Sequence, residues 1–399
     1  MSVGSPGFNG KRLREARVAR GISGADLSVL VGVSRGMVSQ YEKGDASPSP
    51  DKLYSLASAL GVPVDFFLLP DRQFSIEQVF FRSLAAATMA SREKAQKRLL
   101  WLGDLIRYLD EYVAFPDPSL PDFSPKRADY RTPVTGNVIE EAAEETRRSW
   151  QLGDGPISNV TWLLENKGMI ATRGVIETES IDSFSTWLDG RPCLFLGADK
   201  DSAARSRFDA AHELGHAVLH RKIERSQFAD GLGHKIIEKE ADRFASAFLL
   251  PASSFPMDLP APTLQAMQNA KPRWVVSIAA MIHRLADLEA IQPEEERRLY
   301  ISRTRRGWYR EEPLDDTIPV EQPRALGNAL SLVVDQGVKS KEEVLHEFAR
   351  RPEDIESLAG LPAGYFGDDP SPIRLRDRMS PVAKRRGGER AEVVRLRPN

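Results

Sequence analysis

The sequence is poor in the features that mark secreted and membrane proteins. Its 399 residues include one cysteine, Cys193, which excludes an intramolecular disulfide and a cysteine-rich zinc site. The opening residues, MSVGSPGFNG, lack a basic and then apolar signal sequence, and no apolar run approaches the roughly 18 residues of a membrane span. We therefore expect a cytoplasmic protein that makes no membrane contact.

An excess of charge of either sign is also absent. The chain has 55 lysines and arginines against 57 aspartates and glutamates, which gives a net charge of −2. This balance argues against attraction of the whole molecule to nucleic acid, so any DNA binding must come from a local patch. Histidine is scarce too, yet three of the six histidines lie within nine residues: His212, His216 and His220.

The length predicts two or three domains. Helical spacing of apolar residues dominates, and strand signals are confined to one region. The predicted fold class is therefore multi-domain and mostly α, with one small α+β domain and an N-terminal unit of five short helices. The expected ranges are 1–70 for the N-terminal unit, 71–134 for a connecting helix and a Pro-rich linker, 135–260 for the α+β domain, 261–370 for a helical extension, and 371–399 for a basic, disordered tail.

Capping residues and prolines predict where the first elements begin and end. Asn9 is expected to cap the first helix and Ser34 the third. Apolar spacing typical of a helix then continues from residue 80 to 115. Five prolines between 116 and 133 predict a linker without regular structure.

The α+β domain is expected to contain a hairpin and two helices. Strands are predicted over 181–188 and 192–197, joined by Asp189-Gly190, a dipeptide typical of hairpin turns. Helices are predicted over 203–220 and 236–250. The second strand could lie at the edge of its sheet, where it could pair with an extended peptide, or in the interior, and the pattern fits both.

The string His212-Glu213-Leu214-Gly215-His216 is an H-E-x-x-H motif within a predicted helix. Residues four apart share a helix face, so both imidazoles can bind one ion. Glu213 lies about 100° round the helix, where it can accept a proton from a water on that ion. The motif therefore predicts a metal site.

A catalytic zinc usually takes three protein ligands, so a third has to come from elsewhere. His220 lies on the same helix, but one straight helix rarely places three ligands around an ion, and His234 lies in a predicted loop. Glu238 on the next helix is the preferred candidate, because it falls near the apolar stripe of that helix, whereas Glu240 falls toward solvent. Asp242, one turn after Glu238, could hydrogen-bond a ligating histidine and orient it.

The predicted cofactor is Zn²⁺ and the predicted chemistry is hydrolysis of an amide bond. Zinc lowers the pKa of a water that it binds to about 7 and polarises the substrate carbonyl, and Glu213 can take the proton. The simpler interpretation, polar residues on an amphipathic helix, is disfavoured because a second helix offers an inward carboxylate.

The residues around the motif are similar to a known family. The strings RFDAAHELGHAVLH at 207–220, EKEADRFA at 238–245 and LLP at 249–251 resemble the ImmA/IrrE family of metallopeptidases, over about 135–255. The resemblance implies a zincin-like domain in which His212, His216 and Glu238 hold zinc and Glu213 is the catalytic base. It also implies the substrate class, which is helix-turn-helix repressors whose cleavage switches on stress, phage or mobile-element genes. Asp242 stands where many relatives have asparagine.

Residues 8–69 resemble an Xre/Cro-type helix-turn-helix domain through GVSRGMVSQYEKG at 32–44. The resemblance implies double-stranded operator DNA as the partner and the third helix as the recognition helix. The expected DNA contacts are Arg35, Gly36, Ser39, Gln40 and Lys43. Gln40 can pair with adenine, and Arg35 with guanine or a phosphate. Gly24 stands where such domains usually carry a glutamine that contacts the DNA backbone, so a protein-binding bundle without DNA affinity is the alternative.

Together these interpretations predict a DNA-binding transcriptional regulator fused to a zinc metalloendopeptidase that cleaves a repressor. The alternative is a transcription factor whose peptidase-like domain senses a ligand or a partner and cuts nothing, and the intact Glu213 favours the enzyme. A third hypothesis is self-cleavage within 116–133, which would release the DNA-binding unit. We also expect a homodimer through the helix-turn-helix unit or the C-terminal helices.

Overall fold

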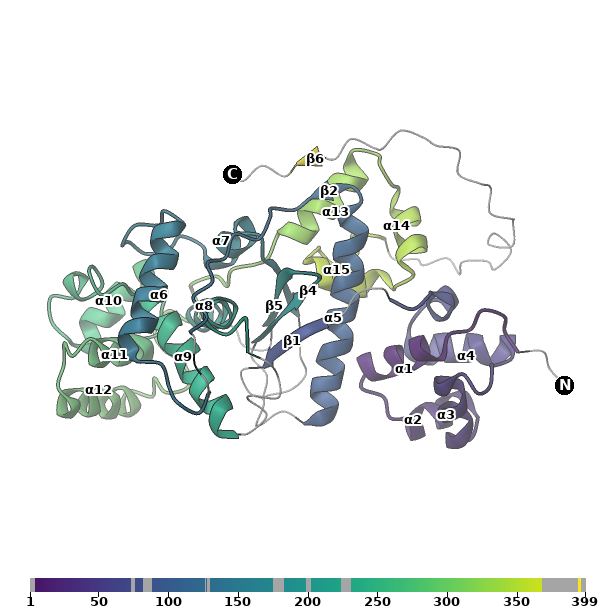
Figure 1. The fold of residues 1–399 in the computed structure, drawn as a ribbon, viewed down its shortest axis with the longest axis horizontal. Helices are drawn as coiled ribbons and strands as arrows, with labels where there is room; N and C mark the ends of the chain where they lie inside the picture. The colour runs from purple at the N-terminus through teal and green to yellow at the C-terminus, as the bar shows by residue number, and fades with distance from the viewer. Residues whose placement is uncertain are drawn as a thin grey trace. The chain divides into compact units, whose positions relative to one another are not determined.

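The computed structural model describes residues 4–72, 88–125, 127, 130–174, 183–198, 202–223 and 231–367, and the backbone of 76–81 and 394–395. The chain is mostly helical and divides into two compact units (Figure 1). Unit 1 comprises 1–76, 87–115 and 324–399, and unit 2 comprises 77–86 and 116–323. The predicted fold class, mostly helical with one small sheet in the later region, is confirmed.

The N-terminal part of unit 1 contains the predicted short helices. They are α1 (Gly10–Ala19), α2 (Gly24–Val31), α3 (Arg35–Lys43), α4 (Pro50–Leu60) and the 3-10 helix η1 (Val64–Leu68). The two predicted caps are confirmed, because the side chain of Asn9 accepts from the N–H of Lys11 and that of Ser34 from the N–H of Met37. Capping side chains satisfy N–H groups that the first turn of a helix leaves without partners.

Helices distant in sequence complete unit 1. They are α5 (Met89–Asp110), α13 (Ala325–Asp335), α14 (Lys341–Phe348) and α15 (Pro352–Ala359). Arg350 is fully buried, 2.8 Å from the carboxylate of Asp104 on α5, and its guanidinium lies 4.3 Å from the ring centre of Phe66. The range expected as one C-terminal extension, 261–370, therefore contributes helices to both units.

The helix predicted over 80–115 is wrong at its N-terminal end. Phe80 and Phe81 belong to strand β1 (Ile76–Phe81), and α5 begins at Met89. β1 pairs with β4 of the main sheet, so a long-range pairing overrides the local helical spacing. Strand β2 (Val113–Ala114) pairs in parallel with β6 (Val394–Arg395), while the rest of the expected basic tail lies outside the described residues.

Unit 2 is built on a four-stranded sheet with the order β1-β4-β5-β3. β3 is Ile170–Gly174, β4 is Ser183–Leu188 and β5 is Arg191–Gly197. β4 and β5 are antiparallel and turn at Asp189-Gly190 with φ angles of 48° and 76°, which confirms the hairpin. β3 runs parallel to β5 on its other side, so β5 is an interior strand and its edges are occupied.

The helices of unit 2 form layers on this sheet. α8 (Ala203–Leu219) packs on β4 and β5, α9 (Gly231–Leu249) packs on α8, and α6 (Gly136–Ser149) packs on α9 (Figure 1). The remaining elements are α7 (Val160–Asn166), η3 (Pro256–Asp258), α10 (Leu264–Trp274), α11 (Ile278–Asp287) and α12 (Pro293–Arg305). One apolar core joins α6 to α12, so both helices expected to carry the metal site are enclosed by packed side chains.

The Pro-rich segment has no regular structure at its described residues, as predicted, but it packs onto the other elements of unit 2. The N–H of Phe123 donates to the carbonyl of Val218 at the end of α8, at 3.1 Å. The indole of Trp150 donates to the carbonyl of Ser119 at 3.0 Å. Leu120 and Phe123 also pack against the apolar core.

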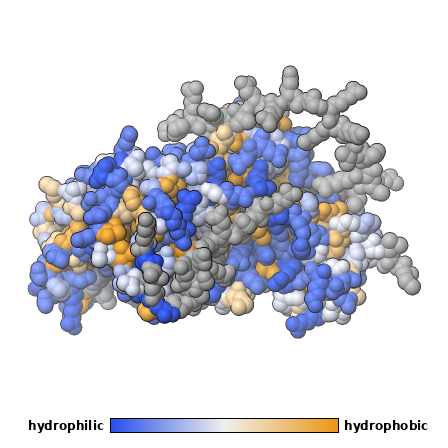
Figure 2. Space-filling view, viewed as in Figure 1, coloured by the Kyte–Doolittle hydropathy of each residue, from blue (hydrophilic) through white to orange (hydrophobic). Residues whose placement is uncertain are grey.

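The visible face of the molecule is largely hydrophilic, with smaller apolar groups between the polar ones (Figure 2). Among the described residues, no helix has the length and apolar character that crossing a bilayer requires.

Candidate metal centre and DNA-reading helix

α8 places the two histidines of the H-E-x-x-H motif at one point. His212 and His216 are both fully buried, and their Nε2 atoms are 3.1 Å apart. The spacing of four residues puts them one turn apart on the same face, as predicted. Gly215 lies between them and close to the neighbouring helix: a Cβ added to it would stand 3.2 Å from the Cα of Ala241.

α9 brings a carboxylate to the same point. The Oε2 atom of Glu238 lies 3.3 Å from Nε2 of His212, and its Oε1 atom lies 3.3 Å from Nε2 of His216. The ligand atoms of these three residues all lie within 4.8 Å of one another. Two imidazole nitrogens and one carboxylate oxygen make a donor set that suits zinc, so the residues present fit the ion that the motif implies.

Asp242 contacts the other ring nitrogen of His212. Its Oδ1 atom lies 2.8 Å from Nδ1 of that ring. Burial by itself lowers the pKa of His212, but hydrogen bonds to Asp242 and Glu238 outweigh burial and raise the pKa to about 9. Burial of His216 dominates instead and lowers its pKa to about 4. The two pKa values differ because carboxylates lie on both sides of the His212 ring, whereas a carboxylate lies on only one side of the His216 ring.

Glu213 points to the sheet. It is fully buried, and its carboxylate accepts hydrogen bonds from the hydroxyls of Ser183 at 2.8 Å and Ser185 at 2.5 Å, both on β4. Burial raises the pKa of Glu213 to about 7, against the lowering effects of His212 and the two serines. A carboxyl group whose pKa is near neutrality can take up and release a proton at physiological pH.

The two serines were missed by the sequence analysis. Ser183 and Ser185 alternate with larger residues on a strand that is otherwise buried, which places both hydroxyls on the face toward α8. Two serines placed two residues apart on a buried strand need buried hydrogen-bond partners, and this pattern in the sequence could have identified them.

Two residues set aside as ligands lie closer to the centre than expected. His234 was predicted in a loop, but α9 begins at Gly231 and includes it, and its Nε2 atom is 3.6 Å from Oε1 of Glu238. Glu240 was predicted to face solvent, which is wrong, because the residue is 3% exposed. Its carboxylate binds Arg127 of the Pro-rich segment. A helical projection considers α9 alone, so it does not show that this segment covers Glu240.

α3 presents the predicted DNA contacts on its outer side. Val38 and Tyr41 are its buried residues. Arg17 on α1 holds the helix through Glu42, with Nε 2.6 Å from Oε1 and Nη2 3.0 Å from Oε2. All five predicted contact residues are exposed: Arg35, Gly36, Ser39, Gln40 and Lys43.

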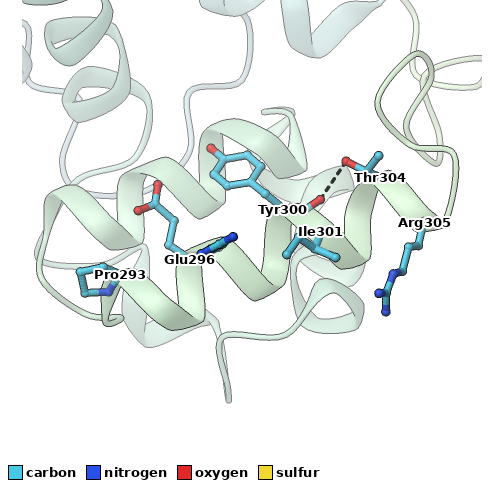
Figure 3. Close-up of a pocket in the computed structure, with 7 residues that line it drawn as sticks. Pro293, Glu296, Tyr300, Ile301, Thr304 and Arg305 are labelled. Carbon is cyan, nitrogen blue, oxygen red and sulfur yellow. Dashed lines mark hydrogen bonds between the residues drawn. The ribbon is translucent and has the colours of Figure 1, made fainter.

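Two surface cavities of about 540 Å³ each lie apart from the ligand set. The first is lined by residues of α12 alone, where the hydroxyl of Thr304 donates to the carbonyl of Tyr300 (Figure 3). The second lies among residues of α8, α9, α11 and α12, and Asp242 lines it. His212, His216 and Glu238 line neither cavity.

Two family models match the chain. Residues 13–67, which hold α3, match a helix-turn-helix model. Residues 170–286, which hold α8 and α9 with the whole ligand set, match a peptidase-family model described as an IrrE N-terminal-like domain.

Two curated transcriptional regulators are similar to part of the chain. A prophage-derived, uncharacterized HTH-type transcriptional regulator, YonR of Bacillus subtilis, is 32% identical over 98 residues, which cover 23% of this chain and 91% of the relative. An uncharacterized transcriptional regulator in the ATPase CF(0) region of Rhodospirillum rubrum is 38% identical over 58 residues, or 14% of this chain, and the chain spans about half (54%) of its length. The chain therefore belongs to the helix-turn-helix transcriptional regulators, and in it that domain is fused to a peptidase-family domain of the IrrE type.

Proposed function

We propose that this regulator is a zinc metalloendopeptidase that cleaves a helix-turn-helix repressor and thereby derepresses stress, phage or mobile-element genes. The observation that carries the proposal is the convergence of His212, His216 and Glu238, together with the buried carboxylate of Glu213, which interacts electrostatically with His212 and Glu238. A donor set for zinc with an adjacent carboxylate is the arrangement that metal-assisted amide hydrolysis requires.

Each polar residue of the centre has a separate role in this proposal. His212, His216 and Glu238 hold the ion, and a zinc ion bound there supplies Lewis-acid activation of water and of a substrate carbonyl. Glu213 accepts the proton of the attacking water and returns it to the leaving amine. The hydroxyls of Ser183 and Ser185 fix the direction of its carboxylate. Asp242 accepts the Nδ1–H of His212, which leaves Nε2 of that ring as the ligand atom.

The helix-turn-helix domain implies operator DNA as a partner, with α3 as the reading helix. A peptidase held on an operator meets repressors bound at the same operator at raised local concentration. This advantage supports a repressor as the substrate, in keeping with the resemblance of the peptidase domain. Homodimerisation through the helix-turn-helix unit or the C-terminal helices would match the symmetry of a palindromic operator.

Glu238→Ala is expected to abolish stoichiometric zinc binding. Wild-type protein should hold about one zinc per chain, and the variant little or none, because two imidazoles alone leave the ion short of a ligand. Inductively coupled plasma mass spectrometry of the full-length protein measures this. Glu141→Ala, an exposed site on α6, is the matched control and should keep its zinc. Zinc-free wild type, or equal zinc in both variants, contradicts the ligand assignment.

Glu213→Gln is expected to slow cleavage of a repressor by about 10²–10⁴-fold while zinc content stays at the wild-type level. The amide keeps the shape of the side chain but cannot accept the proton. Cleavage of purified helix-turn-helix repressors is followed by gel electrophoresis and mass spectrometry, with the exposed Glu144→Gln as control. Equal rates in wild type and Glu213→Gln remove Glu213 as the base, and a wild type that cuts none of them favours a non-cleaving sensor.

Gln40→Ala is expected to relax DNA sequence preference, by about 1–3 kcal/mol at one base pair. Lys43→Ala should instead weaken binding to all sequences and make the salt dependence shallower, because a phosphate contact carries no sequence information. Both effects are measured by fluorescence anisotropy on operator variants at several salt concentrations. A Gln40→Ala protein with unchanged preference would refute direct base reading by this residue.

A further inference from the structure

A chain of buried polar groups extends from the far side of His216. Its Nε2 atom faces Glu238, whereas its Nδ1 atom lies 2.9 Å from Nδ1 of His220. The Nε2 atom of His220 in turn lies 3.0 Å from Oε2 of Glu240. Both imidazoles are fully buried, and the side chain of Glu240 is 4% exposed. Every ring nitrogen of the pair therefore faces a polar partner.

The carboxylate at the end of this chain is held by the Pro-rich segment. Arg127 donates to both oxygens of Glu240, each at 2.7 Å, and its guanidinium lies 4.3 Å from the ring centre of Tyr130. The backbone N–H of Val134 adds a third hydrogen bond at 2.9 Å. A buried carboxylate with a bidentate arginine stays ionised, so it is available as an acceptor for the Nε2–H of His220.

The hydrogen bonds determine which nitrogen of each ring carries the proton. Ionised Glu240 can only accept, so His220 carries its proton on Nε2 and presents Nδ1 as an acceptor. That acceptor requires the proton of His216 on Nδ1, which leaves Nε2 of His216 unprotonated and directed at Glu238. The chain thus selects the tautomer that a metal ligand needs.

We propose that Arg127, Glu240 and His220 are positioning residues for His216, so that zinc binding and the docking of Phe123, Arg127 and Val134 onto α8 and α9 are one coupled equilibrium. The inference rests on the proposed zinc site. Partners behind a ligating histidine fix its ring and raise its affinity for metal. Coupling of this kind is reciprocal, so if docking of the segment strengthens zinc binding, zinc must strengthen docking to the same degree.

A purely structural ion pair makes a different prediction. An Arg127–Glu240 pair that only holds the segment would change the stability of unit 2 and leave zinc affinity untouched. The continuous contact from Glu240 through His220 to His216 is the observation that favours the positioning role.

The test is the zinc affinity of the full-length protein, measured by competition with a chelator of known affinity. Glu240→Gln and Arg127→Met should bind zinc about 10–100-fold more weakly than wild type, and Arg127→Lys should recover part of the loss. The matched controls are exposed residues with the same changes, Glu141→Gln on α6 and Arg131→Met in the same segment, and both should bind as wild type does.

Limited trypsin digestion of the wild type supplies a second measurement that needs no folded variant. Cleavage after Arg131 should slow when zinc is added, and Glu240→Gln, where it folds, should lose this protection. Equal cleavage of the wild type with and without zinc overturns the coupling. Unchanged zinc affinity in Glu240→Gln and Arg127→Met, beside a wild type that binds stoichiometric zinc, overturns the inference alone. A wild type that binds no zinc overturns the proposed function and this inference together.

Discussion

Gly215 on α8 lies against the backbone of Ala241 on α9, and this close approach is the constraint on which the candidate centre depends. A side chain at position 215 would place a Cβ 3.2 Å from both the Cα and the carbonyl oxygen of Ala241. Only glycine lets the two helices meet without displacement, because packed interiors have little room for an added methyl group. The helix contact brings Glu238 to the imidazoles of His212 and His216, and the apolar core around both helices holds it there.

The centre is arranged as layers that come from different parts of unit 2. β4 supplies Ser183 and Ser185, which bind Glu213 on one side of α8. α9 supplies Glu238 and Asp242, which contact His212, and the Pro-rich segment supplies Arg127, which binds Glu240. The candidate centre therefore depends on a strand, two helices and an irregular segment at once, so its geometry follows from the folding of the whole unit.

Features that depend on neighbours in sequence could be predicted, whereas most of those that depend on distant contacts could not. The caps Asn9 and Ser34 and the hairpin at Asp189-Gly190 follow from side-chain and backbone chemistry within four residues. The burial of Glu240 depends on Arg127, 113 residues away, so the helical projection of α9 gave the wrong direction for it. β1 is a similar case, because its pairing with β4 replaces a local helical pattern. The residues of α13 to α15 also do not show that these helices pack in unit 1, because that packing depends on distant contacts such as the one between Arg350 and Asp104.

Zinc K-edge X-ray absorption on the full-length protein tests the central claim most directly, because it reports the ligands of the ion themselves. We expect a shell of two imidazole nitrogens and additional oxygen ligands at about 2.0–2.2 Å, without sulfur. Glu238→Ala should remove this shell or change it to one with fewer protein ligands. A shell that contains sulfur, or an unchanged spectrum in Glu238→Ala, would contradict a metal centre formed by α8 and α9.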